Sequence, residues 1–343
     1  MRAMENLEYS YIVEELKPAE GKHFSNIYRL NEKKYRIKVG EFQIILEAGV
    51  RVNLAKYIED SIEPDQLVNN VKKHLDNLKL KSIRQHGGDR VIIFTFQKGE
   101  DTFALVFEGF GEGNLVLINE GKTIAAMREE SWSDREIRRN KPYSLPKSNV
   151  IPTLAGAISE KYIISALIKL PFGKEYSKEI LKRCGIEEKK PGNSLSKEEI
   201  EHINSEIEKL KGGQKPLAFY SEGQIAGYSL DNLSKFSGME ARSTKTLSEA
   251  IDEFYFHVKE EKNEKVEKLK RRIEEQESRM DSLKEEELQL QKTVDFMHNN
   301  FEELSSIIET AKSVKLDEVE HKLRSYSAKI DKKNKELEIE ITG

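Results

Sequence analysis

The stretch RVIIFTFQKGEDTFALVFEGFGEGNLVLINE, residues 90–120, decides the fold class of this chain. It contains three runs rich in β-branched and aromatic residues, and the clusters KGED and GEG separate these runs. This pattern is typical of antiparallel strands joined by tight turns. A fourth run, TIAAMRE, follows the turn EGK. The segment therefore predicts an antiparallel meander.

Upstream of this meander, residues 23–55 contain four similar runs, HFSNIYRL, KYRIKV, FQIILEA and RVNLA, which predict another meander. An amphipathic helix is expected over 7–18, where Pro18 ends it, and a second helix over 65–77. We expect residues 1–155 to form a strand-rich α+β domain.

Residues 156–250 have a helical pattern, and the turn LPFGKEYSKEIL resembles a helix-hairpin-helix. In one interpretation, free backbone N–H groups at Gly173 and Lys174 hold a phosphate at the start of the second helix. In the other, the segment is only a compact helical corner, because Phe172 interrupts the usual Gly-x-Gly of that motif. Both interpretations stay open. A small hairpin is expected to turn near Glu222-Gly223.

Residues 251–312 predict a long coiled-coil helix. In a heptad phase that starts at Val266, eleven of the thirteen core positions are apolar. Residues 313–343 are expected to form a small middle segment at the coiled-coil tip. No later segment carries a matching heptad, so either the isolated chain forms a homodimer through this helix, or a returning helix lies beyond Gly343. We favour the second explanation, in which the chain is an N-terminal portion of a longer protein.

The composition limits the possible functions. Charged residues make up 34% of the chain, its net charge is −4, and Cys184 is its single cysteine. These features fit a cytoplasmic protein and exclude an internal disulfide, and no segment predicts a membrane span. The sequence contains no nucleotide-binding glycine loop, serine-hydrolase motif or zinc-protease motif. We expect no metal, no cofactor and no catalytic residue.

The segment REESWSDREIRRNKPY, residues 128–143, combines basic and aromatic side chains. Arg135 and Arg138 lie near Trp132 and Tyr143, which suits RNA contact because arginine binds phosphate and aromatic rings stack on bases. A solvated loop with a structural Tyr-Pro corner explains the same pattern.

Asp89 and Arg90 follow Gly87-Gly88 at the mouth of an apolar run. The local interpretation is a type I or II′ turn in which Asp89 bonds nearby amides. The functional interpretation is that both charges are presented to a partner.

Several stretches, taken in order, resemble the NFACT family, which includes RqcH, NEMF and proteins named fibronectin-binding. The resemblance covers about residues 5–310. Its motifs are LEYSYIVEEL, GKHFSNIYRL, AGVRVNL, VKKHLDNLKLKSIRQHGGDRVIIFTF, FEGFGEGNLVLINEG, DREIRRNKPYSLP, LIKLPFGKEYSKEILKRCGI and LSEAIDEFYF. The chain looks most similar to the archaeal branch.

The resemblance implies an N-terminal fold like that of formamidopyrimidine-DNA glycosylases. It also implies a ribosome-associated quality control factor that binds the obstructed large ribosomal subunit and tRNA, with alanyl-tRNA expected in prokaryotic branches. Such a factor promotes C-terminal tailing of the stalled nascent chain without mRNA. The ribosome performs the peptide transfer, so the chain is not expected to be an enzyme.

The family's functional Asp-Arg pair falls on Asp89 and Arg90. Glu8 stands where the family usually has Asp, and Arg51 matches its G-x-R position. Arg135 and Arg138 complete the residues expected to bind tRNA. We expect Asp89 and Arg90 to reach solvent on a face shared with Glu8.

Asn140 replaces the Gly of the family's R-x-I-x-x-G segment and is expected to adopt a left-handed conformation.

Two hypotheses of other classes remain. One is a DNA-lesion glycosylase or lyase, although the N-terminal sequence MRAMEN offers no proline nucleophile. The other is an adhesin or scaffold that acts through the coiled coil, against which the lack of an apolar signal core argues.

Overall fold

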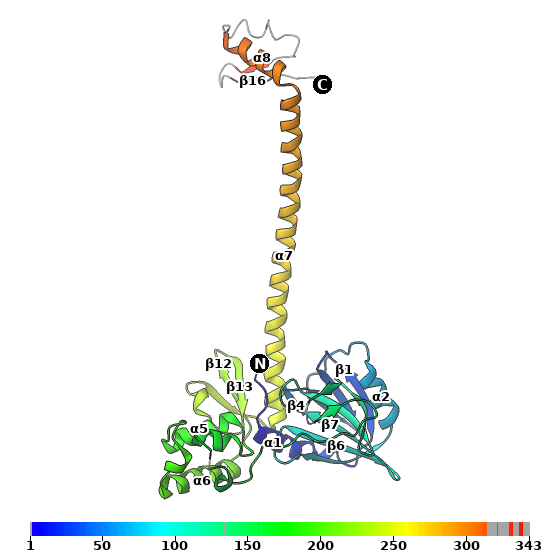
Figure 1. Ribbon diagram of the computed structural model, residues 1–343, viewed down its shortest axis with the longest axis vertical. Coiled ribbons are helices and arrows are strands. Elements are labelled where there is room, and N and C mark those ends of the chain that lie inside the picture. The colour runs from blue at the N-terminus through cyan, green and yellow to red at the C-terminus, as the bar shows by residue number, and fades with distance from the viewer. Residues whose placement is uncertain are drawn as a thin grey trace. The chain divides into compact units, whose positions relative to one another are not determined.

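A computed structural model describes residues 2–132, 135–158, 160–313, 321, 329–331 and 336–338, without the side chains of 157, 258–267, 330–331 and 336–337. The chain divides into two compact units, Met1–Glu261 and Lys262–Gly343. The first is an α+β unit with several antiparallel sheets (Figure 1), which confirms the predicted fold class. It contains both the strand-rich and the helical regions; the four-part domain division stays a prediction.

The first meander is a four-stranded antiparallel sheet in chain order. Its strands are β1 (Phe24–Arg29), β2 (Lys34–Val39), β3 (Phe42–Glu47) and β4 (Arg51–Leu54). Helix α2 (Gln66–Leu75) follows, and the Asp65 carboxylate caps it by accepting the Val68 N–H at 2.9 Å.

The second meander is a five-stranded antiparallel sheet, also in chain order. Its strands are β5 (Lys79–Gln85), β6 (Val91–Lys98), β7 (Asp101–Glu108), β8 (Asn114–Asn119) and β9 (Lys122–Ala126). The main core covers one face, at Ile92, Phe94 and Phe96, and a smaller cluster that includes Ile93 and Ile137 covers the other. Because both faces are covered, β6 is apolar almost throughout.

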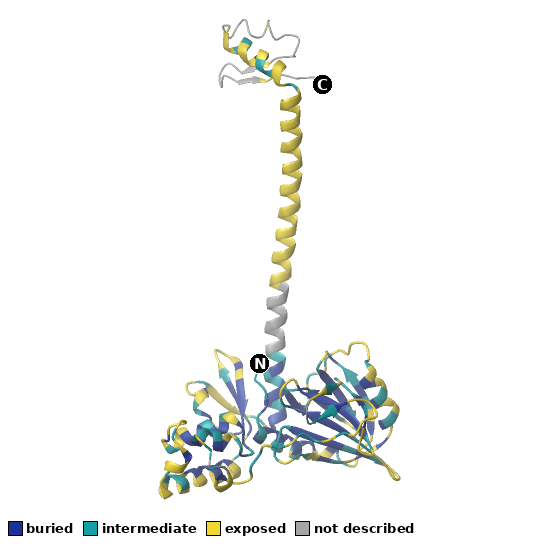
Figure 2. Ribbon diagram, viewed as in Figure 1, coloured by how far each residue is buried: buried dark blue, intermediate teal, exposed yellow. Residues whose placement is uncertain are grey.

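Helix α1 (Asn6–Leu16) continues into a 3₁₀ turn, η1 (Lys17–Ala19), and contacts β4 and β5. Its buried face belongs to the main core (Figure 2). The helix therefore joins the two meanders to one hydrophobic core.

The helical region contains α3 (Leu154–Ala157), α4 (Ile163–Ile168), α5 (Lys174–Cys184), η2 (Gly192–Ser194) and α6 (Lys197–Gly212). Gly185 ends α5 with a left-handed φ of 68°. The expected hairpin is formed by β12 (Leu217–Ser221) and β13 (Gln224–Ser229), and β14 (Glu240–Ser243) extends it to three strands after η3 (Ser234–Phe236). Three strands were not predicted: β14 and the short pair β10 (Glu130–Ser131) and β11 (Glu136–Ile137).

The long helix, α7 (Leu247–Asn299), begins inside the first unit, where Leu247, Ile251 and Tyr255 are buried. It ends before Asn300, and α8 (Phe301–Ser313) follows. Two of the predicted heptad core positions on its second half, Leu283 and Leu290, are exposed. Figure 2 shows this half of the helix as exposed.

The second unit also contains β15 (Lys329–Asp331) and β16 (Glu336–Glu338), which pair. In this unit the sequence LDEVEHKLRSY, residues 316–326, predicts a helix, and KELEIEIT, residues 335–342, predicts a strand. Apart from residues 321 and 336–338, both segments lie outside the described residues. Among the helices described, none is long and apolar enough to cross a membrane.

Candidate nucleic-acid interface

The Asp89-Arg90 pair follows a tight turn between β5 and β6. Gly87 and Gly88 both have positive φ, 56° and 73°, and the Asp89 N–H donates to the His86 carbonyl at 2.9 Å. Positive φ at both central residues is the signature of a type I′ turn. This corrects the expected type I or II′ turn, because two adjacent glycines allow both conformations.

The Asp89 side chain has a hydrogen-bond partner, whereas the Arg90 side chain has none among the described residues. One Asp89 carboxylate oxygen accepts the Arg90 N–H at 2.7 Å, as the local interpretation expects. The Arg90 guanidinium makes no hydrogen bond or ion pair within the described parts of the chain, and the residue is half-buried. Gln85 and Asn6 fix the backbone around the pair, since the Gln85 amide donates to the Asp89 carbonyl at 2.8 Å and the Asn6 amide to the Gly88 carbonyl at 2.9 Å. A rigid turn therefore presents a cation that has no acceptor among the described residues.

Asp89 and Arg90 line a cleft of about 580 Å³ that also includes Gly173 and Lys174. The other residues around it come from α1, α4 and the connecting segments: Glu5, Asn6, Phe110, Pro146, Lys147, Asn149, Val150, Ile168 and Lys169. The structure thus brings together four of the predicted site residues. It adds three charged residues that the sequence patterns did not single out, Glu5, Lys147 and Lys169. We call this space the Arg90 cleft.

The start of α5, predicted as a phosphate-binding turn, already holds an anion from the same chain. The Glu5 carboxylate accepts the Lys174 N–H at 2.9 Å, and a Cβ at Gly173 would overlap that carboxylate. Burial, and after it the neighbouring Glu8, raises the pKa of Glu5. Gly173 therefore has a structural use here, and phosphate binding at this turn stays a prediction.

Glu8 does not share a solvent-facing surface with Asp89 and Arg90, so that expectation is wrong. Its side chain is fully buried, pairs with Arg2 and accepts the Tyr176 hydroxyl at 2.9 Å. It also accepts the Glu5 N–H at 2.9 Å, which completes a capping box at the start of α1. These three donors occupy the carboxylate inside the fold.

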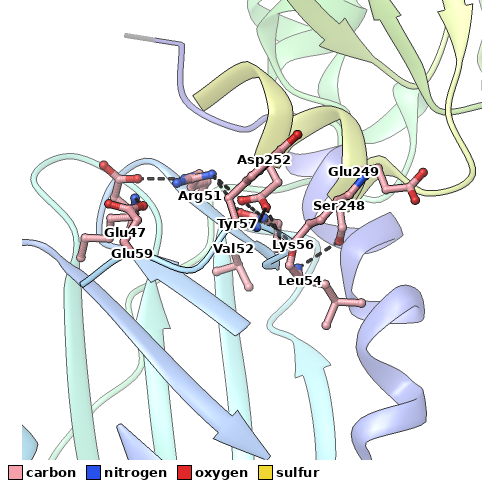
Figure 3. Close-up of polar contacts among 12 residues, drawn as sticks. Glu47, Arg51, Val52, Leu54, Lys56, Tyr57, Glu59, Ser248, Glu249 and Asp252 are labelled. Atoms are coloured by element: carbon pink, nitrogen blue, oxygen red, sulfur yellow. Dashed lines mark hydrogen bonds and ion pairs between the residues drawn. The ribbon is translucent and has the colours of Figure 1, made fainter. Parts of the chain in front are cut away.

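Arg51 is likewise buried, at the junction between β4 and α7 (Figure 3). Its guanidinium donates to Glu47 at 2.9 Å, lies 3.7 Å from the Asp252 carboxylate, and stacks 4.1 Å from the Tyr255 ring centroid. Asp252 also accepts the N–H groups of Lys56 and Tyr57, at 2.6 and 2.9 Å. The predicted tRNA contact by Arg51 therefore lacks an accessible side chain.

The Arg135 side chain has partners within the chain and also lines a cleft. It pairs with Glu108, donates to the Tyr143 hydroxyl at 3.0 Å and to the Ser144 carbonyl at 2.9 Å. Burial, followed by the Glu108 charge, raises the pKa of Tyr143, so the hydroxyl remains protonated. Arg135 also lines a neighbouring cleft with Trp132.

Arg138 is exposed and is not among the residues that line either cleft. Its ion pairs with Glu129 and Glu136 are long, 3.8 and 3.4 Å. Asn140 has the expected left-handed φ, 63°. No group of three or more metal-ligating side chains occurs among the residues that the structure describes.

The sequence profile of the family described as NFACT N-terminal and middle domains matches residues 7–341. The chain belongs to this family. Two similar proteins are named for Rqc2 or for the ribosome quality control complex. The archaeal Rqc2 homolog aRqcH of Methanocaldococcus jannaschii is 30% identical over 234 residues, which cover 61% of this chain and 34% of that protein. Ribosome quality control complex subunit 2 of Schizosaccharomyces pombe is 29% identical over 143 residues, 38% of this chain and 14% of that protein.

Among solved structures, the fibrinogen binding protein from Staphylococcus aureus covers 73% of this chain and 98% of its own length. Its TM-score is 0.58 at 19% identity, which shows a shared fold alone. MutM (Fpg) of Thermus thermophilus aligns with 61% of this chain and 75% of its own length, at a TM-score of 0.32 and 14% identity.

Proposed function

We propose that this chain binds tRNA at the Arg90 cleft, as part of a ribosome-associated quality control factor. The factor acts in the cytoplasm on the obstructed large ribosomal subunit, with alanyl-tRNA as the expected form of tRNA. It promotes mRNA-independent C-terminal tailing of the stalled nascent chain. The ribosome carries out the peptide transfer, so the chain itself supplies binding rather than catalysis.

One observation carries this proposal: a rigid turn fixes the backbone beside Arg90, which lines a cleft and whose guanidinium has no acceptor among the described residues. A guanidinium left without an acceptor at the edge of a folded core is suited to a phosphate, which accepts two parallel hydrogen bonds from it. Lys174, exposed on the same cleft, adds positive charge. Similarity to relatives named for ribosome quality control supports tRNA and the ribosome as partners.

The test compares Arg90→Ala with Arg242→Ala in the whole chain. Both variants lose one positive charge, but Arg242 lies on β14 and pairs with Glu240 at 2.8 Å. We expect Arg90→Ala to weaken tRNA binding about tenfold or more, as for a lost hydrogen bond between charged groups of roughly 1.5–3 kcal/mol. The plot of log affinity against log salt concentration should also become less steep, by the contribution of about one phosphate contact.

The Arg242→Ala variant should bind tRNA like the wild type. Equal losses in both variants would mean that only net charge matters, which contradicts the proposal. Cleavage of abasic-site DNA by the wild-type chain would favour the DNA-lesion lyase hypothesis instead.

A further inference from the structure

A second cleft, of about 610 Å³, adjoins the Arg90 cleft. Phe110, Pro146, Lys147 and Asn149 line both, so the two clefts lie side by side and one extended ligand can contact both. Trp132 lies on the wall of the second cleft, which we call the Trp132 cleft.

Trp132 is the single tryptophan of the chain, and 48% of it is exposed. The backbone N–H of Trp132 donates to the Arg135 carbonyl at 2.8 Å beside the β10–β11 pair, and the Arg135 guanidinium lies 5.7 Å from the indole centroid. Arg135 is fixed in turn by Glu108 and Tyr143. The backbone of Trp132 is therefore fixed and its indole lies beside Arg135, while much of its apolar surface meets water, and a second flat ring that covered it would gain favourable stacking.

The charges around the two clefts differ. In the Trp132 cleft, Arg135 pairs with Glu108, and Arg128 pairs with Glu130 at 2.5 Å. Both cations are thus neutralised by carboxylates. In the Arg90 cleft, Arg90 has no acceptor within the described parts of the chain. A phosphate therefore favours the Arg90 cleft, and an uncharged aromatic ring favours the Trp132 cleft.

We infer that Trp132 stacks against an unpaired base of an RNA whose backbone phosphate meets Arg90. This inference rests on the proposed function and adds the ligand class of a second site: an unstacked base in a single-stranded loop or end. Bases inside a duplex cover each other's faces, so the Trp132 cleft selects single-stranded RNA, with little preference for base identity.

The test uses the intrinsic fluorescence of Trp132, which is the only indole in the chain. The whole chain is titrated with an end-labelled adenosine oligonucleotide of about eight nucleotides, a usual site size for single-strand binding, and with duplex RNA of the same length. We expect the single strand to quench the fluorescence and the duplex to leave it unchanged. By anisotropy of the labelled RNA, Trp132→Ala should weaken binding about 5- to 150-fold, the range for one stacked base, whereas Trp132→Phe should retain most of the affinity.

RNA that binds by anisotropy without quenching, with equal affinity for Trp132→Ala, overturns this inference and leaves the role of Arg90 intact. Absence of any RNA binding by the wild-type chain overturns the proposed function and the inference together.

Discussion

The turn that carries Arg90 and the junction that carries Arg51 hold the same side chain in opposite environments. The Arg51 side chain is 3% exposed and is shared among Glu47, Asp252 and the Tyr255 ring. Arg90 lies in a cleft and, among the described residues, its guanidinium has no acceptor. A family motif identifies both arginines equally, so the difference teaches that free hydrogen-bonding capacity, rather than the presence of a charge, separates a binding residue from a structural one.

The largest expected difference between the two arginines is in their contribution to the free energy of unfolding. Arg51→Ala leaves the Glu47 and Asp252 carboxylates at a buried junction without their cation. We expect the free energy of unfolding, measured by urea denaturation, to fall by about 3–5 kcal/mol. Arg90→Ala is the matched control and should stay within about 0.5 kcal/mol of the wild type. Similar losses in the two variants would remove the distinction.

A smaller effect concerns the pH dependence of the same junction. Glu15 accepts the N–H groups of Leu247 and Ser248 at the start of α7, at 2.5 and 3.0 Å, and burial raises its pKa above the ordinary 4.5. A raised folded-state pKa means that the group stabilises the fold most below 4.5 and that this contribution is lost as the pH rises through the folded pKa.

The stability of the wild type relative to Glu15→Gln should therefore decline as the pH rises above 4.5. Urea denaturation across this pH range measures the decline. Glu14→Gln, which removes an exposed carboxylate from the same helix, corrects for net charge. A relative stability that increases with pH would show that the α7 donors outweigh burial.

The smallest effect is expected at Arg138, which sharpens the comparison with Arg90. Arg138 is exposed and its ion pairs are long, so Arg138→Ala should change the free energy of unfolding by less than about 0.5 kcal/mol. Its effect on tRNA affinity, measured beside Arg90→Ala at the same salt concentration, should be clearly the smaller of the two. A larger loss of tRNA affinity in Arg138→Ala than in Arg90→Ala would indicate that the RNA contacts the protein near Arg138 rather than in the Arg90 cleft.

The features that could be predicted from sequence are those with local causes. Runs rich in β-branched and aromatic residues, separated by turn clusters, predicted both meanders, and a left-handed conformation was expected at Asn140. The pairs β10–β11 and β12–β14 were missed because such short strands depend on their partner rather than on their own composition.

The hydrogen-bond and ion-pair partners of the site residues could not be predicted, because these partners are distant in sequence. Glu8 meets Tyr176 across 168 positions, and Asn53, next to the Arg51 network, meets Asp252 across 199. Glu5 carried no motif of its own, although it reaches the start of α5 and lines the Arg90 cleft. Only the packing of α1 against α5 and α7 reveals which charges are already paired.

The most direct test of the Arg90 cleft as the tRNA site is site-specific photocrosslinking. An ultraviolet-activated residue is placed at Asn149, an exposed position that lines both clefts, and as a control at Glu222, in the turn between β12 and β13. Crosslinks to tRNA from position 149 and not from 222, reduced when Arg90 is also replaced by Ala, are the predicted result. Equal crosslinking from the two positions, or none from 149 while tRNA remains bound, would contradict the account.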